Sequence, residues 1–153
     1  MLFAKNFKGE TPLCLAVLYN RFEVVEIICN VVSANHFMKE GNHVIHLAVE
    51  MGSLEIVKLL LSKGANPTIP DDNGDTPIHV AARTQNVEML KLLTSFILKV
   101  PNKDGLTPLQ IAKSNGNPEA IDILQNFQDI TSDHFYSSDQ TKDEKKLERK
   151  RKD

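Results

Sequence analysis

Apolar side chains recur in four stretches of the chain with the spacing of one helix face. In each stretch they stand at positions i, i+1, i+3 and i+4 behind a glutamate, which places them on the same side of an α-helix. The four sets are Val24, Val25, Ile27 and Ile28; Ile56, Val57, Leu59 and Leu60; Met89, Leu90, Leu92 and Leu93; and Ala120, Ile121, Ile123 and Leu124. The pattern therefore predicts four helices, each beginning near its glutamate. These glutamates are Glu23, Glu55, Glu88 and Glu119.

A second pattern begins fourteen residues before each of these glutamates. It consists of similar blocks that start at a glycine: GETPLCLAV from Gly9, GNHVIHLAV from Gly41, GDTPIHVAA from Gly74 and GLTPLQIAK from Gly105. Three blocks contain Thr–Pro, and a Thr side chain can cap a helix whose first residue is Pro. We therefore expect a short helix in each block, so that helix pairs repeat every 31 to 33 residues.

Turn residues separate the predicted helices. Within the pairs, turns are expected around Asn20, Gly52, Gln85 and Gly116. The sequence KGANP at 63–67 is typical of a helix end, with Gly64 in the left-handed conformation and a proline beyond it. Asp, Asn and Gly residues at 71–74 predict a tight turn between two pairs.

The blocks TPLCLA and TPIHVA, with EIVKLLLSKGAN after the second glycine block, resemble the ankyrin repeat. The resemblance covers about residues 5–127 and implies an all-α solenoid of about four helix-turn-helix repeats with short β-turn fingers. The repeats are expected near 5–36, 37–69, 70–100 and 101–127, within a domain of residues 1–128. No polar capping repeat precedes the first one, so we expect either a compact array or part of a longer array.

Composition excludes several classes of protein. The 153 residues include 18 Lys and Arg against 20 Asp and Glu, and a net charge of −2 gives no overall positive field for nucleic acid or an anionic membrane. No apolar run has the length of a membrane span, and the first residues lack a signal peptide. The two cysteines fit neither a disulfide scaffold nor a paired metal motif. We expect a cytoplasmic monomer without a cofactor.

Residues 129–153 differ in composition from the repeats. They are polar and charged, and we expect a disordered charged tail. The tail has a basic cluster that consists of Lys145, Lys146, Arg149, Lys150, Arg151 and Lys152. This cluster has three interpretations: a nuclear localisation signal, a phosphate-binding arm, or a solubilising end. The first would add the nucleus to the expected location.

One repeat position holds Cys14, His46, His79 and Gln110. A metal site would need three or four ligands around one centre, whereas stacked repeats spread these residues along a line. The alternative is that each histidine forms a hydrogen bond to the adjacent repeat, and the spacing favours it. No nucleophile–base pattern or phosphate-binding glycine loop is present, and stacked helix pairs offer no deep pocket. The sequence therefore favours a protein that is not an enzyme.

Stacked helix pairs form an extended concave surface, and such surfaces bind proteins. We expect the contacts to come from residues just after each glycine and from the exposed side of each first helix. These residues are Glu10, Leu18, Tyr19, Asn42, Glu50, Met51, Asp75, Arg83, Thr84, Leu106, Ser114 and Asn115.

The segments TPLCLAV followed by Tyr19-Asn20, and GNHVIHLA at 41–48, are similar to the inhibitor-of-kappa-B branch of ankyrin proteins. This resemblance implies binding to a Rel homology dimer of an NF-kappa-B type factor, which masks its nuclear signal and its DNA-binding state. The chain lacks a D-S-G-x-x-S phosphodegron and a Pro-rich acidic tail, as in the virus-encoded ankyrin inhibitors of polydnaviruses, which it resembles. The alternative function is a general adaptor or scaffold with another protein partner.

Overall fold

The computed structural model describes residues 2–36, 42–96 and 99–135. Over these residues the chain forms eight α-helices, one short 3-10 helix and no strand. The helices are α1 (Pro12–Leu18), α2 (Phe22–Cys29), α3 (Val44–Glu50), α4 (Leu54–Ser62), α5 (Pro77–Thr84), α6 (Val87–Leu93), η2 (Thr94–Phe96), α7 (Pro108–Asn115) and α8 (Pro118–Phe135). In this part of the chain no helix is long and apolar enough to cross a membrane. The prediction of an all-α fold is confirmed.

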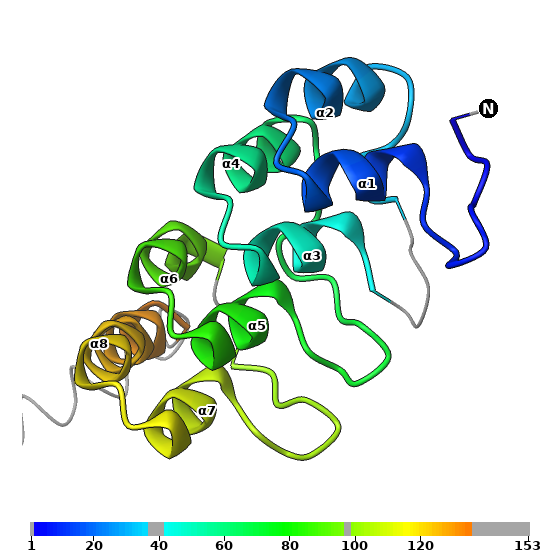
Figure 1. The fold of residues 1–153 in the computed structure, drawn as a ribbon. Coiled ribbons are helices and arrows are strands. Elements are labelled where there is room, and N and C mark those ends of the chain that lie inside the picture. The colour runs from blue at the N-terminus through cyan, green and yellow to red at the C-terminus, as the bar shows by residue number, and fades with distance from the viewer. Residues whose placement is uncertain (1, 37–41, 97–98, 136–153) are drawn as a thin grey trace, which may run out of the picture.

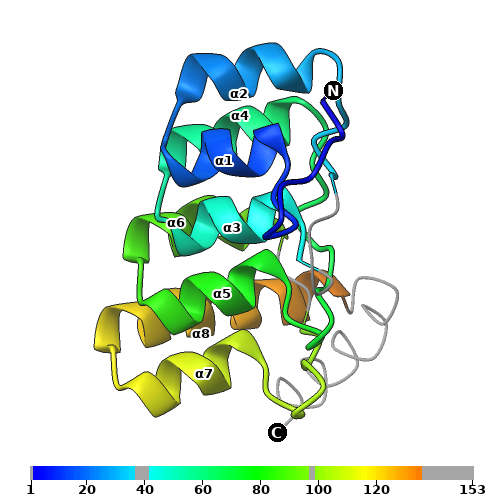
Figure 2. The same ribbon diagram turned by 45° about the vertical axis from the view of Figure 1, so that its right-hand side comes forward.

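The helices form two rows, because each repeat contributes one helix to each row. Helices α1, α3, α5 and α7 make the inner row, in which each helix contacts the next (Figure 2). Helices α2, α4, α6 and α8 make the outer row behind it (Figure 1). The loop from α4 to α5 and residues 99–107 before α7 project to the same side, from which the inner helices begin (Figure 1). The stack is therefore a short solenoid of four helix pairs.

Threonine caps begin the inner helices, as predicted. The Thr11 hydroxyl accepts a hydrogen bond from the backbone N–H of Cys14, and the Thr107 hydroxyl accepts one from that of Gln110. Proline follows each of these threonines at the first helical position, where no hydrogen bond is lost. In repeat two His43 takes this place with extended backbone, so the inner helix begins there without a Thr–Pro pair.

The predicted turns within the helix pairs share one backbone feature. The residues at this position have positive φ in all four repeats: Asn20 (53°), Gly52 (73°), Gln85 (58°) and Gly116 (71°). Gly64, the predicted cap of α4, also has positive φ, at 90°. Positive φ is a conformation that glycine adopts without steric cost and that Asn tolerates.

The hydrophobic core runs along the stack between the two rows. Alanine lies at one position of every inner helix and is buried each time, which lets the rows approach closely. These residues are Ala16, Ala48, Ala81 and Ala112. From the outer row, Leu60, Leu90 and Leu124 belong to the same buried cluster. Met89 is fully buried and Met51 is exposed, in agreement with their predicted places in the core and at the surface.

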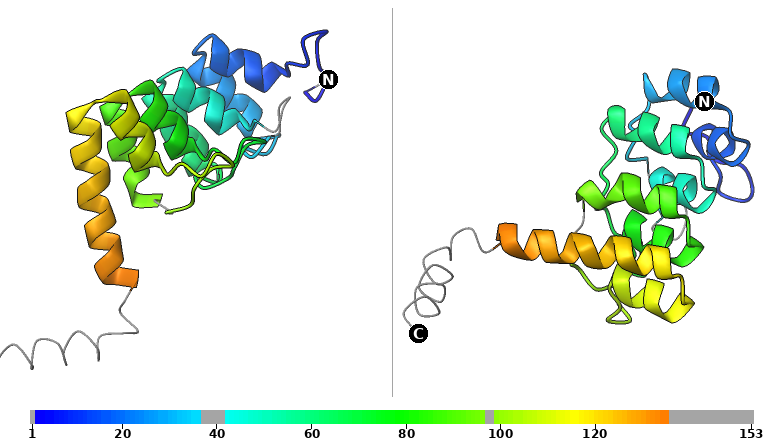
Figure 3. Two further views of the ribbon diagram at one scale, coloured as in Figure 1. Left: turned by 90° about the horizontal axis from the view of Figure 1, so that it is seen from below. Right: turned by 90° about the vertical axis from the view of Figure 1, so that its left-hand side faces the viewer.

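The last helix runs past the residue at which the sequence predicts the end of the domain. The sequence led us to end the domain at residue 128, but α8 continues to Phe135 and extends past the other outer helices (Figure 3). Once a helix has begun, each further residue adds a backbone hydrogen bond without a new nucleation cost, and residues 129–135 contain neither Pro nor Gly. Polar composition alone was therefore a poor marker of the helix end. The basic cluster at 145–152 lies outside the described residues.

Candidate protein-binding surface

The fingers are the loops at residues 6–10, 71–75 and 102–106, and they share one turn geometry. Each begins with Asn or Asp, whose side-chain oxygen accepts backbone N–H groups two and four residues further on. In the second of them Asp71 Oδ1 accepts from Asn73 N over 2.8 Å and from Asp75 N over 2.9 Å. This bonding holds the tip in a tight turn. Sequence analysis missed Asn6 and Asn102, although Asn or Asp three residues before the glycine is a readable signal.

The histidines of the inner helices link each repeat to the next. His46 Nε2 donates to the Asp75 carbonyl over 2.9 Å, and His79 Nε2 donates to the Leu106 carbonyl over 3.2 Å. Their Nδ1 atoms accept from the backbone at the start of their own helices. The predicted hydrogen bonds to the adjacent repeat are confirmed.

The other two residues at this repeat position bond within their own repeats. Gln110 Oε1 accepts from Thr107 N over 2.8 Å, and the Cys14 thiol lies 3.1 Å from the Thr11 hydroxyl. Among the described residues no three His, Cys, Asp or Glu side chains are arranged to hold a metal ion.

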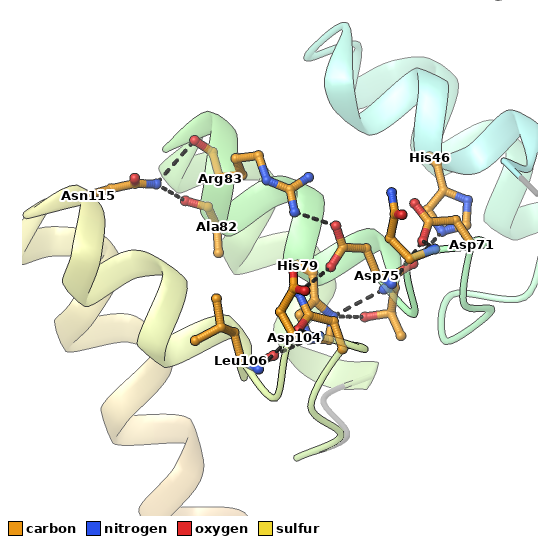
Figure 4. A network of polar contacts seen from close by, with 12 residues as sticks. His46, Asp71, Asp75, His79, Ala82, Arg83, Asp104, Leu106 and Asn115 are labelled. Carbon is orange, nitrogen blue, oxygen red and sulfur yellow. Dashed lines mark hydrogen bonds and ion pairs between the residues drawn. The ribbon is translucent and has the colours of Figure 1, made fainter. Parts of the chain in front are cut away.

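Asp75 differs from the prediction. It was expected at the surface as a partner contact, but only 2% of it is exposed. One carboxylate oxygen pairs with Arg83 and the other accepts from Asn102 Nδ2 over 2.8 Å (Figure 4). The carboxylate therefore joins α5 to the following finger, and it is the guanidinium of Arg83, about half exposed, that reaches the surface.

The charges in this network follow from burial and pairing. Burial acts to raise the pKa of Asp75, but hydrogen bonds from Arg83 and Asn102 and the Arg83 charge outweigh it, so the pKa lies below its ordinary value. Burial lowers the pKa of His46 and of His79, against the opposing effect of hydrogen bonds to backbone carbonyls. The network therefore holds an ionised Asp75 beside neutral histidines at neutral pH.

A polar cavity of about 190 Å³ lies between the inner helices α3 and α5 and the finger at 71–75. Its lining consists of Asn42, His46, Glu50, Asp71, Asn73, Val80, Arg83 and Thr84. Glu50 and Asp71 bring carboxylates to it, whereas the one cation in the lining, Arg83, is already paired with Asp75. The cavity is therefore net acidic. Four predicted contact residues meet there: Asn42, Glu50, Arg83 and Thr84.

The remaining predicted residues are spread along the stack. Tyr19, Met51 and Leu106 are well exposed, at 71%, 48% and 40%. Leu18 and Glu10 are half-buried, and Glu10 accepts from Asn6 Nδ2 over 2.8 Å within the first finger. Ser114 and Asn115 end α7.

Two of these side chains have structural partners as well. The Asn115 amide donates to the carbonyls of Ala82 and Arg83, both over 3.3 Å, and so ties α7 to α5 (Figure 4). The Ser114 hydroxyl donates to the Ile111 carbonyl over 2.8 Å within α7. The predicted residues that share one cavity therefore come from repeats two and three, and Tyr19 and Leu106 are exposed on either side of them along the stack.

Comparison with known proteins agrees with this fold. Residues 45–94 match the family model described as ankyrin repeats in many copies. The chain is 31% identical over 92 residues to a fowlpox virus ankyrin repeat protein, covering 60% of this chain and 64% of the relative.

Two cellular proteins are also similar to parts of the chain. It is 36% identical over 95 residues to a CCCH zinc finger domain-containing protein of Arabidopsis thaliana, covering 58% of this chain and 14% of the relative. It is 45% identical over 53 residues to the human transient receptor potential cation channel subfamily A member 1. This match covers 35% of this chain and 5% of the relative.

In all three relatives the matching segment spans less than two thirds of the protein, and their names describe proteins of different kinds. What they share with this chain is the repeat. Ankyrin repeats are typically non-catalytic modules that bind other proteins. The helix pairs, the period and these matches together show that the fold is a stack of ankyrin repeats, which implies a module for protein-protein interaction.

Proposed function

We propose that this stack binds a Rel homology dimer of an NF-kappa-B type transcription factor and sequesters it. The observation that carries the proposal is the pair of segments TPLCLAV and GNHVIHLA, which are similar to the inhibitor-of-kappa-B branch. Residues of both segments form inner helices α1 and α3, at whose ends the predicted contact residues Leu18 and Glu50 lie. Sequestration keeps the factor in the cytoplasm and off DNA.

The chemistry of the cavity in repeats two and three supports a basic partner segment. Glu50 and Asp71 line it, and the paired Arg83 adds little net positive charge. A nuclear localisation signal is a short run of Lys and Arg. Such a segment would meet complementary charge in this cavity and an exposed apolar contact at Met51 beside it.

The match to a fowlpox virus protein supports the finer part of the proposal, a virus-encoded inhibitor that acts in the cytoplasm and the nucleus of a host cell. An inhibitor without a phosphodegron is not released by the host signal that degrades its cellular counterparts. The second candidate is a general adaptor, which the variety of the relatives' names favours.

Binding of the purified full chain to a recombinant Rel homology dimer, at two salt concentrations, tests the proposal. We expect tight binding that weakens at high salt, because charge contributes to the contact. Glu50→Lys should weaken binding at least tenfold and Met51→Ala should weaken it less.

The matched control is Glu55→Lys, which makes the same charge change on the exposed side of outer helix α4. It should leave binding unchanged. Absence of binding by the unmodified chain would reject the Rel proposal and favour the adaptor, whose partner an unbiased pull-down would then identify. Equal losses in Glu50→Lys and Glu55→Lys would reject the concave surface as the site.

A further inference from the structure

The first repeat presents an apolar face at its end of the stack. A groove of about 520 Å³ lies there between α1 and α2, lined by Pro12, Leu15, Ala16, Tyr19, Arg21, Val24 and Ile28. Val24 is 44% exposed, and Ile27, one helical turn further along the same face, is 66% exposed. A contiguous apolar surface of this kind marks an interaction site more often than a bare end.

Residues at the equivalent positions of the later repeats differ from this face in their burial. The residues that correspond to Val24 in the later repeats are Ile56, Met89 and Ala120, and all three are fully buried. Leu59, Leu92 and Ile123 correspond to Ile27; Leu59 is 8% exposed, and the other two are half-buried. The side chains of the first repeat therefore have the apolar character of residues that are buried inside the stack, although they lie at its surface.

The other end of the stack is polar at the positions that contact a following repeat. Lys113 is exposed where Val17, Val49 and Ala82 are buried, and Gln125 is exposed where Thr94 is buried. Gln110 is exposed where His46 and His79 are buried. Fourth-repeat residues therefore cap that end. Stacking the apolar face of one chain on this end of another would desolvate Lys113 and Gln125 without partners.

We propose that a second copy of this chain covers the apolar face, so that α1 and α2 of two copies pack against each other around a twofold axis. A twofold contact brings the same patch of both copies together. The apolar end of one copy would therefore pack on the apolar end of the other. The inference replaces the monomer expected from sequence and does not depend on the Rel proposal.

Charge and area are consistent with this occupant. Arg21 lines the groove and Glu23 opens α2, so both signs of charge border the apolar strip, as a self-complementary contact needs. A standard interface buries about 800 Å² on each partner, and an aromatic side chain such as Tyr19 supplies about 150–250 Å² of that when fully buried. We expect a dimer that dissociates on dilution.

Sedimentation velocity of the full chain from low-micromolar to submillimolar concentration tests the proposal. We expect a monomer–dimer equilibrium, and Ile27→Lys should raise the dimer dissociation constant at least tenfold. Ile27 is mostly exposed, so this variant should fold, and its melting temperature checks that it does. Gln125→Lys, which adds the same charge at the opposite end, should leave dimerisation unchanged.

A second measurement locates the contact. Ile27→Cys should form a disulfide-linked dimer under mild oxidation, and Gln125→Cys should not; Cys14 is buried and Cys29 is half-buried in both. A monomer at every concentration would overturn the proposal. So would equal weakening by Ile27→Lys and Gln125→Lys, which would indicate head-to-tail association instead.

Discussion

The junction between repeats three and four is held differently from the junction between repeats one and two. In the later junction His79 donates to the Leu106 carbonyl, and Asn102 donates to the buried carboxylate of Asp75. The backbone N–H of Lys103 also donates to the Asn73 carbonyl over 2.9 Å. Buried or backbone polar bonds therefore cross this junction from one finger to the next.

In the earlier junction Cys14 occupies the place of His79, and its thiol contacts Thr11 of its own repeat. Hydrogen bonds that cross this junction, such as Ser53 Oγ to Asn20 Oδ1 over 3.0 Å, lie at the surface. The other contacts across this junction come from the buried apolar packing of α1 on α3. Among the described residues, this repeat position thus decides whether the inner helix forms a side-chain hydrogen bond to the next repeat.

The largest effect should come from removing that bond. His79→Ala leaves the Leu106 carbonyl and the Thr76 N–H without their partners and opens a cavity in a fully buried place, so we expect a loss of about 3–4 kcal/mol in unfolding free energy. Cys14→Ala removes one buried sulfur and no bond to another repeat, and should cost about 1 kcal/mol.

Urea denaturation of both variants measures these losses. Amide hydrogen exchange adds the location, because contacts in a repeat stack are local. His79→Ala should raise exchange mainly in repeats three and four. Equal losses of unfolding free energy in the two variants would contradict the distinction between the junctions.

A Cβ atom added to a finger glycine gives a second test of how the junctions between repeats differ. A Cβ on Gly74 would lie 2.9 Å from the backbone nitrogen of Lys103, at a φ of +76°, whereas a Cβ on Gly105 at +77° meets nothing within 4 Å. Gly74→Ala should therefore cost about 2–3 kcal/mol and Gly105→Ala about 1 kcal/mol. The difference between their denaturation midpoints reports the close approach of the two fingers, and similar midpoints would show that it is absent.

Much of the fold was predictable because each repeat contains the same local signals. The apolar spacing, the Thr–Pro caps and the positive-φ turn positions depend only on nearby residues, so they could be read from the sequence. The end of α8 could not, because a polar sequence is compatible with both a solvated chain and an exposed helix.

The candidate surface was predicted less completely. The hydrogen bonds of His46 and His79 followed from residue type and repeat position, but the burial of Asp75 did not. Asp75 directly follows the glycine of its repeat, as Glu10 and Leu106 do, but those two residues are not buried. What buries Asp75 is a three-way contact with Arg83 and Asn102, residues eight and 27 positions away, and such a coincidence has no local pattern.

A smaller effect should appear on acidification. Both histidines have folded-state pKa values below the unfolded value of about 6.5, so the unfolded chain binds more protons at acidic pH. Their stabilising effect is fully present above about pH 6.5 and is lost as the pH falls below it. We expect the melting temperature to fall between pH 7 and pH 5.

The control variant is His46→Gln with His79→Gln, since Gln110 makes the same helix cap in repeat four. This variant should lose less stability over the same pH interval. His36, whose pKa burial also lowers, is present in both proteins and does not bias the comparison. A pH dependence equal to that of the unmodified chain would show that the buried histidines are not its source.

The smallest effect should come from the exposed side of the same junction that contains His79. Lys91 on α6 lies 3.9 Å from Glu119 on α8 and 3.3 Å from Glu88, and all three side chains are more than half exposed. Exposed pairs gain little because water and salt screen them, so Lys91→Ala should cost less than about 0.5 kcal/mol, and less still at high salt. His79 and Lys91 each make a polar contact between repeats three and four, so a simple count of contacts would treat them as equal. If denaturation shows that they contribute equally, then burial does not control the strength of a junction, and the difference between the first and third junctions would need another cause.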